Sequence, residues 1–166
     1  MTITVVIGPP CAGKSTFAKE SRKTDDVVVD YDELAKAFGS EISHLSHGSI
    51  RHVALAARRE AINVILSGIK HDAFIIHTNP NDEMVERYIN ANANFILIDP
   101  SKETCVDRAK ERPSHVLGGI ENWYKNPPSI ISKLNLKPKE LFNDDKILQI
   151  IEQRELLKSL DKRLKG

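Results

Sequence analysis

The chain has 166 residues, of which 40% are hydrophobic and 28% charged, and its formal net charge at pH 7 is +1. This length suits one globular domain with its own core, so we expect residues 1–166 to form a single unit. The small net charge argues against a protein that attracts polyanions through its overall field, and it leaves nucleic-acid contact to a local patch.

The cysteine content and the hydropathy pattern favour an intracellular protein. Cys11 lies in a glycine-rich loop and Cys105 in a predicted helix. Two cysteines placed in this way match neither a disulfide framework nor a zinc-binding pattern. The sequence shows no signal-peptide pattern, and no apolar run approaches the ~18–20 residues that cross a bilayer. We therefore expect a cytoplasmic protein with no membrane contact.

In chain order, apolar stretches alternate with segments of helical spacing. Strands are predicted over residues 2–7, 26–30, 73–77 and 94–99. Helices are predicted over 13–22, 32–38, 49–68, from 81 onward, and over 101–112, 120–125 and 143–165. This alternation predicts an α/β fold of three layers, with helices on both faces of a mainly parallel sheet of four or five strands. A ligand is expected outside the carboxyl ends of the strands.

A phosphate-binding loop follows the first predicted strand. The segment GPPCAGKS at residues 8–15 matches G-x-x-x-x-G-K-[ST], and a predicted helix follows it directly. Glycines let successive amides converge on a phosphate, and the helix N-terminus adds partial positive charge. Lys14 is predicted to reach the β- and γ-phosphates, and Ser15 to offer its hydroxyl to Mg²⁺. The predicted nucleotide-binding residues of the loop are Gly8, Pro10, Cys11, Ala12, Gly13, Lys14, Ser15 and Thr16.

The residues that follow the other predicted strands indicate which type of reaction the protein catalyses. No guanine-reading Asn-Lys-x-Asp segment is present, which argues against a GTP switch. Asp30 and Asp32 follow the second strand, where a carboxylate would accept the proton of an acceptor hydroxyl. We predict Asp32 as this catalytic base, and the alternative is that it only caps the next helix. Asp99, after the fourth strand, is a candidate Walker-B carboxylate or an ordinary strand exit.

Two arginines follow the fourth strand in the segment CVDRAKERP. Arg108 and Arg112 are four residues apart, so on one helix they would share a face. Guanidinium groups there would neutralise the charge that spreads over a transferring phosphoryl group. We predict that both bind the nucleotide and act in catalysis as part of a lid over 108–126. The alternative is a solvated face paired with Asp107 or Glu111.

In their order and spacing, these segments resemble the P-loop kinase domain of phage-type polynucleotide 5′-kinases and related small-molecule kinases. The segment GPPCAGKST is similar to the family's P-loop, and DYDEL is similar to the segment whose aspartate activates the acceptor, which implies that role for Asp32. The pair Thr78-Asn79 in HTNP, the arginines of DRAKER and the segment VLGGIENWYK also match, so the resemblance covers about residues 1–126. In two places the sequence departs from the family. Ala35, with Lys36 beside it, replaces an arginine that grips the acceptor's phosphate, and His77 stands where a carboxylate is expected.

The acceptor is expected to bind under the segment 32–70. Candidate substrate-binding residues are Asp30, Lys36, Arg51, Arg58, Thr78 and Asn79. The alternative for the arginines is a solvated helix face opposite an apolar stripe. A metal site of His44, His47 and His52 fits no zinc spacing well. Trp123 and Tyr124 would stack on a base or, as aromatic side chains more often do, pack the short helix against the body.

Together these features predict an ATP-dependent, Mg²⁺-requiring kinase. Its acceptor would be a polynucleotide 5′-hydroxyl, a nucleoside or nucleotide, a modified base in DNA or another small hydroxyl compound. The alternatives are a non-kinase P-loop ATPase and a nucleotide-gated binding module. The apolar stripe of the predicted helix over 143–165 is expected to cover the sheet or to form a homo-oligomer contact.

Overall fold

The computed structural model describes residues 1–41 and 48–139. His44, His47 and the predicted helix over 143–165 lie outside the described residues. Among the helices that the structure describes, none combines the length and the apolar character needed to cross a lipid bilayer.

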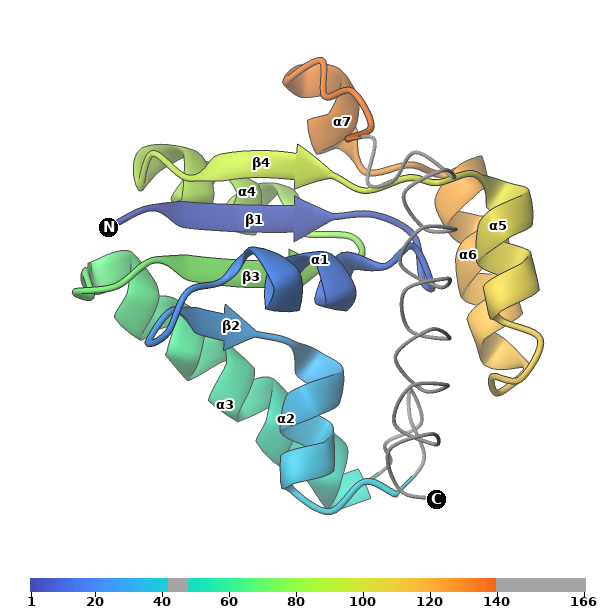
Figure 1. Cartoon of the computed structure of the whole chain (residues 1–166), viewed down its shortest axis with the longest axis horizontal. Helices are drawn as coiled ribbons and strands as arrows, with labels where there is room; N and C mark the ends of the chain where they lie inside the picture. The colour runs from blue at the N-terminus through green and yellow to red at the C-terminus, as the bar shows by residue number, and fades with distance from the viewer. Residues whose placement is uncertain (42–47, 140–166) are drawn as a thin grey trace, which may run out of the picture.

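The centre of the fold is a parallel sheet of four strands in the order β2-β3-β1-β4 (Figure 1). The strands are β1 (Ile3–Ile7), β2 (Val27–Val29), β3 (Ala73–His77) and β4 (Asn94–Leu97). Every residue of β1 is buried, because the strand pairs with β3 and β4 on its two sides and helices cover both faces. All four predicted strands are therefore confirmed, together with their parallel arrangement.

The edge of the sheet beyond β4 is partly covered by a late segment of the chain. Leu97 forms a single parallel bridge with Pro138, and the Lys139 amide donates to the Leu97 carbonyl over 2.8 Å. A proline lacks an amide donor, so this contact does not continue into a regular ladder. Within the described residues the sheet thus has four strands and the beginning of a fifth pairing.

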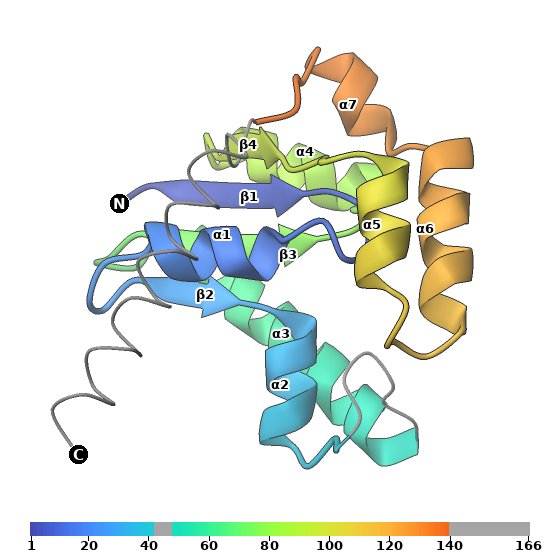
Figure 2. The same cartoon turned by 45° about the vertical axis from the view of Figure 1, so that its right-hand side comes forward.

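The helices form the two outer layers (Figures 1 and 2). They are α1 (Lys14–Ser21), α2 (Tyr31–Ala37), α3 (Gly48–Ser67), α4 (Asp82–Asn90), α5 (Lys102–Arg108), α6 (His115–Lys125) and α7 (Ser129–Lys133). One core cluster joins the sheet to α3, α4 and α7, and a second joins it to α1, α5 and α6. Alternate β1 residues serve the two clusters, with Val5 in the first and Val6 in the second. The predicted three-layer α/β/α architecture is confirmed.

The predicted helix over 101–112 is too long. The structure ends α5 at Arg108, and the Arg112 amide donates to the Ala109 carbonyl over 2.9 Å in a tight turn. Pro113 explains this early end, because proline disfavours helical backbone at the residue before it. Arg112 therefore does not share a helix face with Arg108. The next helix, α6, begins at His115 rather than near 120, and α7 was not predicted.

Gly8 is required by the close approach of two strand ends. A Cβ atom at this position would lie 2.1 Å from the Ile98 carbonyl oxygen, a backbone atom that cannot move without its strand. We expect Gly8→Ala to destabilise the protein by about 3 kcal/mol or more in urea unfolding, since overpacking costs ~1–3 kcal/mol even where side chains can adjust.

Gly118 offers the matched control for that substitution. It lies within α6, and a Cβ atom added there would have no heavy atom within 4 Å beyond its chain neighbours and the nearby backbone of its own helix. Gly118→Ala should therefore be neutral or stabilise the protein by up to about 1 kcal/mol through helix propensity. Equal unfolding midpoints for the two variants would contradict the packing role of Gly8.

Candidate functional site

A cavity of about 1280 Å³ lies at the carboxyl ends of the strands. All four strand exits contribute to its lining: the loop after β1, Asp30 after β2, Thr78 after β3, and Asp99 after β4. The predicted crevice is thus present. Segments far apart along the chain meet there because parallel strands end at the same edge of the sheet.

The loop between β1 and α1 has the backbone of a phosphate cradle. Gly13 has a φ of 97°, in the left-handed region that glycine adopts without steric cost, and α1 begins at the next residue. Cys11 also has a positive φ, 62°, which is uncommon for a residue with a side chain. The first amides of a helix have no carbonyl partner within it, so the N-terminus of α1 is suited to an anion. Of the predicted loop residues, Gly8 is outside the cavity lining, and the others line it.

Lys14 is folded back onto the loop. Its side-chain amine donates to the carbonyl oxygens of Gly8 and Pro9 over 2.9 and 2.6 Å, and the residue is only 8% exposed. Burial lowers the pKa of Lys14 to about 8, although the nearby Asp30 carboxylate opposes that shift. The positive charge of this amine is therefore poorly solvated, and a phosphate in the cradle would compensate it.

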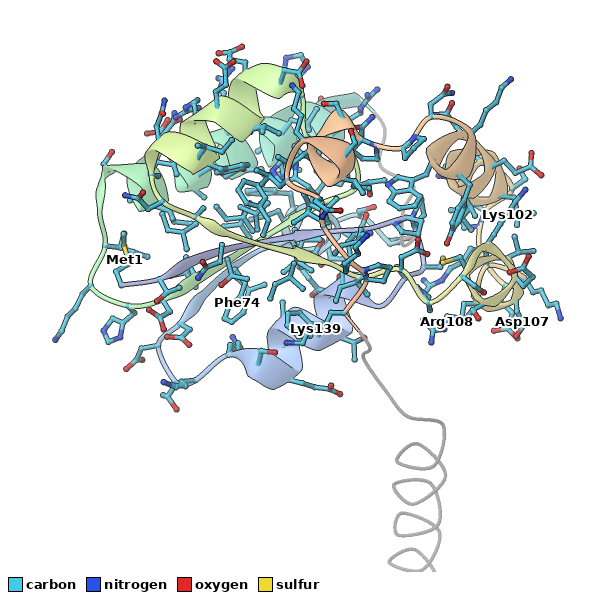
Figure 3. All side chains as sticks on the ribbon, turned by 90° about the horizontal axis from the view of Figure 1, so that it is seen from above. Met1, Phe74, Lys102, Asp107, Arg108 and Lys139 are labelled. Carbon is cyan, nitrogen blue, oxygen red and sulfur yellow. The ribbon has the colours of Figure 1, made fainter. Side chains whose placement is uncertain are left out.

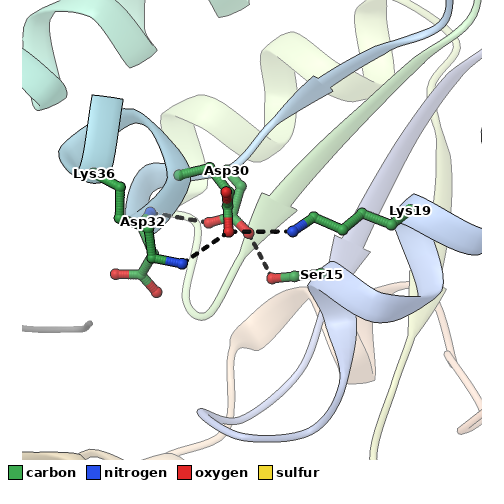
Figure 4. A network of polar contacts seen from close by, with 6 residues as sticks. Ser15, Lys19, Asp30, Asp32 and Lys36 are labelled. Carbon is green, nitrogen blue, oxygen red and sulfur yellow. Dashed lines mark hydrogen bonds and ion pairs between the residues drawn. The ribbon is translucent and has the colours of Figure 1, made fainter. Parts of the chain in front are cut away.

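Ser15, at the start of α1, is hydrogen-bonded to Asp30, directly after β2 (Figure 4). The Ser15 hydroxyl donates to Asp30 Oδ2 over 2.5 Å, and the other carboxylate oxygen accepts the Asp32 amide over 3.0 Å. Asp30 is thus the N-cap of α2 as well as the partner of Ser15, and it is 5% exposed. The interpretation of Asp32 as the cap of this helix is wrong, because Asp30 occupies that position one residue before α2.

The Ser15–Asp30 pair fits a magnesium ion. Mg²⁺ takes hard oxygen ligands and is bound in phosphate-transfer sites by one or two protein oxygens together with phosphates and water. A hydroxyl and a buried carboxylate that already face each other supply such ligands. Elsewhere in the described chain, no cluster of three or more histidine, cysteine or acidic side chains is placed to hold a metal.

Asp32 lies in the first turn of α2 and lines the cavity, where it is partly buried. Lys36, one turn further along, also lines the cavity, but its amine is 3.1 Å from Glu33 Oε1 and its side chain is 46% exposed. Lys19 of α1 approaches the same Glu33 oxygen over 3.2 Å. The charge of Glu33 is thus matched by two lysines, of which Lys19 joins α1 to α2 and Lys36 lies on α2 itself.

The two arginines after β4 both line the cavity, in different ways. Arg108 donates to the carbonyl oxygens of Cys11 and Ala12 over 3.3 and 3.2 Å. Figure 3 shows it turned toward the body of the molecule, whereas Asp107 on the same helix points outward and pairs with Lys110. Arg112 reaches the cavity from the turn after α5, and its charge counteracts the burial that raises the pKa of Cys11. Arg108 is exposed, as the alternative of a solvated face implies, but in the described chain it donates to the P-loop rather than pairing with Asp107 or Glu111.

At the end of β3, His77 makes a buried contact that the sequence did not indicate. His77 Nε2 lies 2.6 Å from the Tyr88 hydroxyl, and both residues are buried. Burial, together with the charges of Arg58 and Lys14, lowers the pKa of His77 to about 3. His77 is therefore neutral at physiological pH, unlike the carboxylate that the resemblance implied at this position.

The remaining predicted substrate residues separate into two groups. Thr78, Asn79 and Arg58 line the cavity, whereas Arg51 is exposed and does not. Arg51 therefore lies as the alternative of a solvated helix face describes, outside the cavity that Arg58 lines. Trp123 is 5% exposed and donates from Nε1 to the Thr78 carbonyl over 3.1 Å, so it packs α6 against the sheet rather than offering a stacking surface. The Tyr124 hydroxyl donates to Asp99 over 2.5 Å.

This arrangement agrees with a comparison of the sequence with protein families. A family model described as an AAA domain (AAA_33) matches residues 3–117, which include every strand and the P-loop. The chain belongs to this AAA domain family. A comparison with curated proteins gives no match.

Solved structures place the fold of this AAA domain among P-loop kinases. The structure titled "Structure of the Pnkp1/Rnl/Hen1 RNA repair complex" matches with a TM-score of 0.60 at 16% identity, over 86% of this chain and 49% of that chain. This AAA domain thus spans about half the length of that protein. Shikimate kinase from Acinetobacter baumannii, in complex with shikimate, matches with a TM-score of 0.55 at 15% identity, over 94% and 96% of the two chains. The predicted P-loop kinase-like fold is confirmed.

Because His77 is neutral in the folded protein, the free energy of unfolding of this AAA domain should depend on pH. An unfolded histidine has a pKa near 6.5, so below that pH the unfolded chain binds a proton that the folded chain excludes. The contribution of neutral His77 to the free energy of unfolding is complete above pH 6.5. It decreases as the pH falls toward 3. Between pH 7 and 5 we expect a loss of about 2 kcal/mol from this residue, at 1.36 kcal/mol per pH unit.

Urea unfolding of the wild type and of His77→Gln at both pH values measures this contribution. Glutamine can still bond Tyr88 but does not titrate, so the variant should lose less stability than the wild type. His52→Gln removes an exposed histidine and serves as the control. Parallel pH profiles for the wild type and His77→Gln would contradict a buried, neutral His77.

Proposed function

We propose that this AAA domain is an ATP-dependent kinase that transfers the γ-phosphate to a hydroxyl group of a nucleic-acid-related or other small acceptor. The observation that carries the proposal is the meeting of the P-loop, the Ser15–Asp30 pair and Asp32 in one cavity. A nucleotide-binding cradle alone requires only the first two. A third group able to take a proton, on the acceptor side of that cradle, is what a transferase needs.

In the proposed reaction, the acceptor oxygen forms a bond to the γ-phosphorus while the bond from that phosphorus to the β,γ-bridging oxygen breaks, and ADP leaves. The acceptor's hydroxyl proton passes to the Asp32 carboxylate. Lys14 leaves its carbonyl partners to contact the phosphates, and Arg108 and Arg112 approach from the other wall to match the spreading negative charge. When bound, Mg²⁺ would be held by Ser15 and Asp30 and would neutralise charge on the β- and γ-phosphates.

The fold leaves several classes of acceptor to be tested. The two matched structures come from an RNA repair complex and from a shikimate kinase, so the same fold serves proteins of very different context. A polynucleotide 5′-hydroxyl, a nucleoside or nucleotide, a modified base in DNA and a small metabolite therefore all enter the test.

The family description favours one competing function. AAA domains include ATPases, so this protein would hydrolyse ATP as part of an assembly or as the timer of a binding module. In that case water, rather than an organic hydroxyl, would receive the phosphate. The product of the reaction separates the two functions, because only a kinase makes a phosphorylated acceptor.

The test is a screen with γ-labelled ATP and Mg²⁺ against oligonucleotides with a 5′-hydroxyl, DNA that contains hydroxyl-modified bases, nucleosides, nucleotides and hydroxy acids. We expect one class to become labelled and to raise the rate of ADP release at least about tenfold over the rate without acceptor. Release of labelled inorganic phosphate at a rate that no acceptor changes would favour the ATPase and reject the kinase.

A further inference from the structure

Arg58 is a partly buried cation on the acceptor side of the cavity with no acidic partner among the described residues. Its guanidinium donates from Nη2 to the Ile76 carbonyl over 2.8 Å, at the next-to-last residue of β3. No ion pair joins it to a carboxylate in the described chain, and burial lowers its pKa although Asp30 opposes the shift. A guanidinium has five N–H donors, so most of its hydrogen-bonding capacity remains for a ligand.

Two carboxylates that line the same cavity as Arg58 already have partners. Asp30 is held by Ser15 and by the Asp32 amide, and its charge would serve the metal site proposed above. Glu33 is matched by Lys19 and Lys36. His77, which also lines this part of the cavity, is neutral and adds no negative charge.

We propose that Arg58 binds an anionic group of the acceptor, a carboxylate or a phosphate, so that the preferred acceptor is a hydroxyl compound that carries a negative charge. This inference rests on the proposed kinase function, and it names the substrate class of the same site. Charge-assisted, bidentate binding to carboxylate or phosphate is what arginine does best. Arg58 places this cation on α3, at the wall of the cavity that the end of β3 forms.

The position of Arg58 also orients such an acceptor. The guanidinium is anchored to β3 beside Ile76, whereas Asp32 approaches from α2 and the P-loop from β1. An acceptor whose anion is held at β3 presents its hydroxyl toward the other two elements. Arg58 would therefore act on acceptor binding and leave the ATP site unchanged.

The first experiment measures anion binding without catalysis. The P-loop is filled with Mg²⁺ and a non-hydrolysable ATP analogue, and malonate and inorganic phosphate are titrated separately by calorimetry as carboxylate and phosphate probes. We expect saturable binding of at least one probe to the wild type, at least about tenfold weaker binding to Arg58→Met, and unchanged binding to Arg59→Met, which removes an exposed neighbour. No saturable binding to the wild type, or equal binding to Arg58→Met, overturns the anion site.

The second experiment measures transfer with matched acceptor pairs, such as a nucleoside and its monophosphate, or a hydroxy acid and its amide. The charged member should be preferred, and Arg58→Met should raise its KM about 10- to 100-fold while leaving the affinity for the ATP analogue unchanged. Preference for the uncharged members overturns the proposal, and the preferred pair identifies carboxylate or phosphate. Anion binding without transfer to any acceptor would instead reject the kinase function and retain the site.

Discussion

Asp32→Asn is expected to lower the rate of phosphoryl transfer by about 10²–10⁴-fold, the range that general-base catalysis contributes. Asparagine keeps the size and polarity of the side chain but cannot accept the acceptor's proton. The Asp32 backbone amide, which Asp32→Asn keeps, donates to Asp30, and the Asp32 carboxylate is the weakest of the charges that act on the pKa of Lys14. The affinity for ATP should therefore change by less than about threefold, as measured by calorimetry beside a single-turnover assay.

Asp107→Asn is the matched control for that experiment. Asp107 is an exposed carboxylate on α5 that points outward and pairs only with Lys110 among the described residues (Figure 3). This variant should transfer phosphate at the wild-type rate. Near-normal turnover of Asp32→Asn would end the assignment of Asp32 as the base and would leave a nucleotide-binding protein without an identified acceptor group.

Lys14→Met is expected to weaken ATP binding and to reduce transfer by at least about 10²-fold, because it removes the cation that would neutralise charge on the phosphates. The same substitution should change the stability of the nucleotide-free protein. Burial lowers the pKa of Lys14 from 10.5 to about 8, so the unfolded chain holds a proton between these pH values that the folded chain releases. The wild type should therefore gain stability as the pH rises from about 8 to 10.5, by up to about 3 kcal/mol.

Urea unfolding across that pH range compares the wild type, Lys14→Met and Lys102→Met. Cysteines and tyrosines also titrate there, so the informative quantity is the difference between the wild type and each variant. Lys14→Met should lack the gain in stability, whereas Lys102→Met, which removes an exposed lysine of α5, should retain it. Retention of the full gain in Lys14→Met would show that this amine is not held in a poorly solvated site.

The sheet and the P-loop could be predicted from the sequence because local patterns determine both. Runs such as Ile3–Ile7 are apolar and β-branched at nearly every position, as expected of strands covered on both faces. The spacing of Gly8, Gly13 and Lys14 reflects backbone geometry within one short loop. Since parallel strands end at one edge, the crevice followed from the strands alone.

Side-chain environments that depend on distant partners could not be predicted in this way. The end of α5 at Arg108 results from Pro113 and a tight turn, so a spacing of four residues did not mean a shared helix face. Arg51 and Arg58 look alike in sequence, yet only Arg58 meets β3 at Ile76. The pairing of His77 with Tyr88 joins a strand to a helix, and nothing in either segment indicates it.

The most direct test of the central claim is a crystal structure of this AAA domain with Mg²⁺ and a non-hydrolysable ATP analogue. We predict that Lys14 contacts the terminal phosphate, that Ser15 and Asp30 lie on the metal side of it, and that the Asp32 carboxylate faces the terminal phosphorus from the acceptor side. A structure in which the analogue fills the P-loop but Asp32 points away from the terminal phosphate would contradict the account.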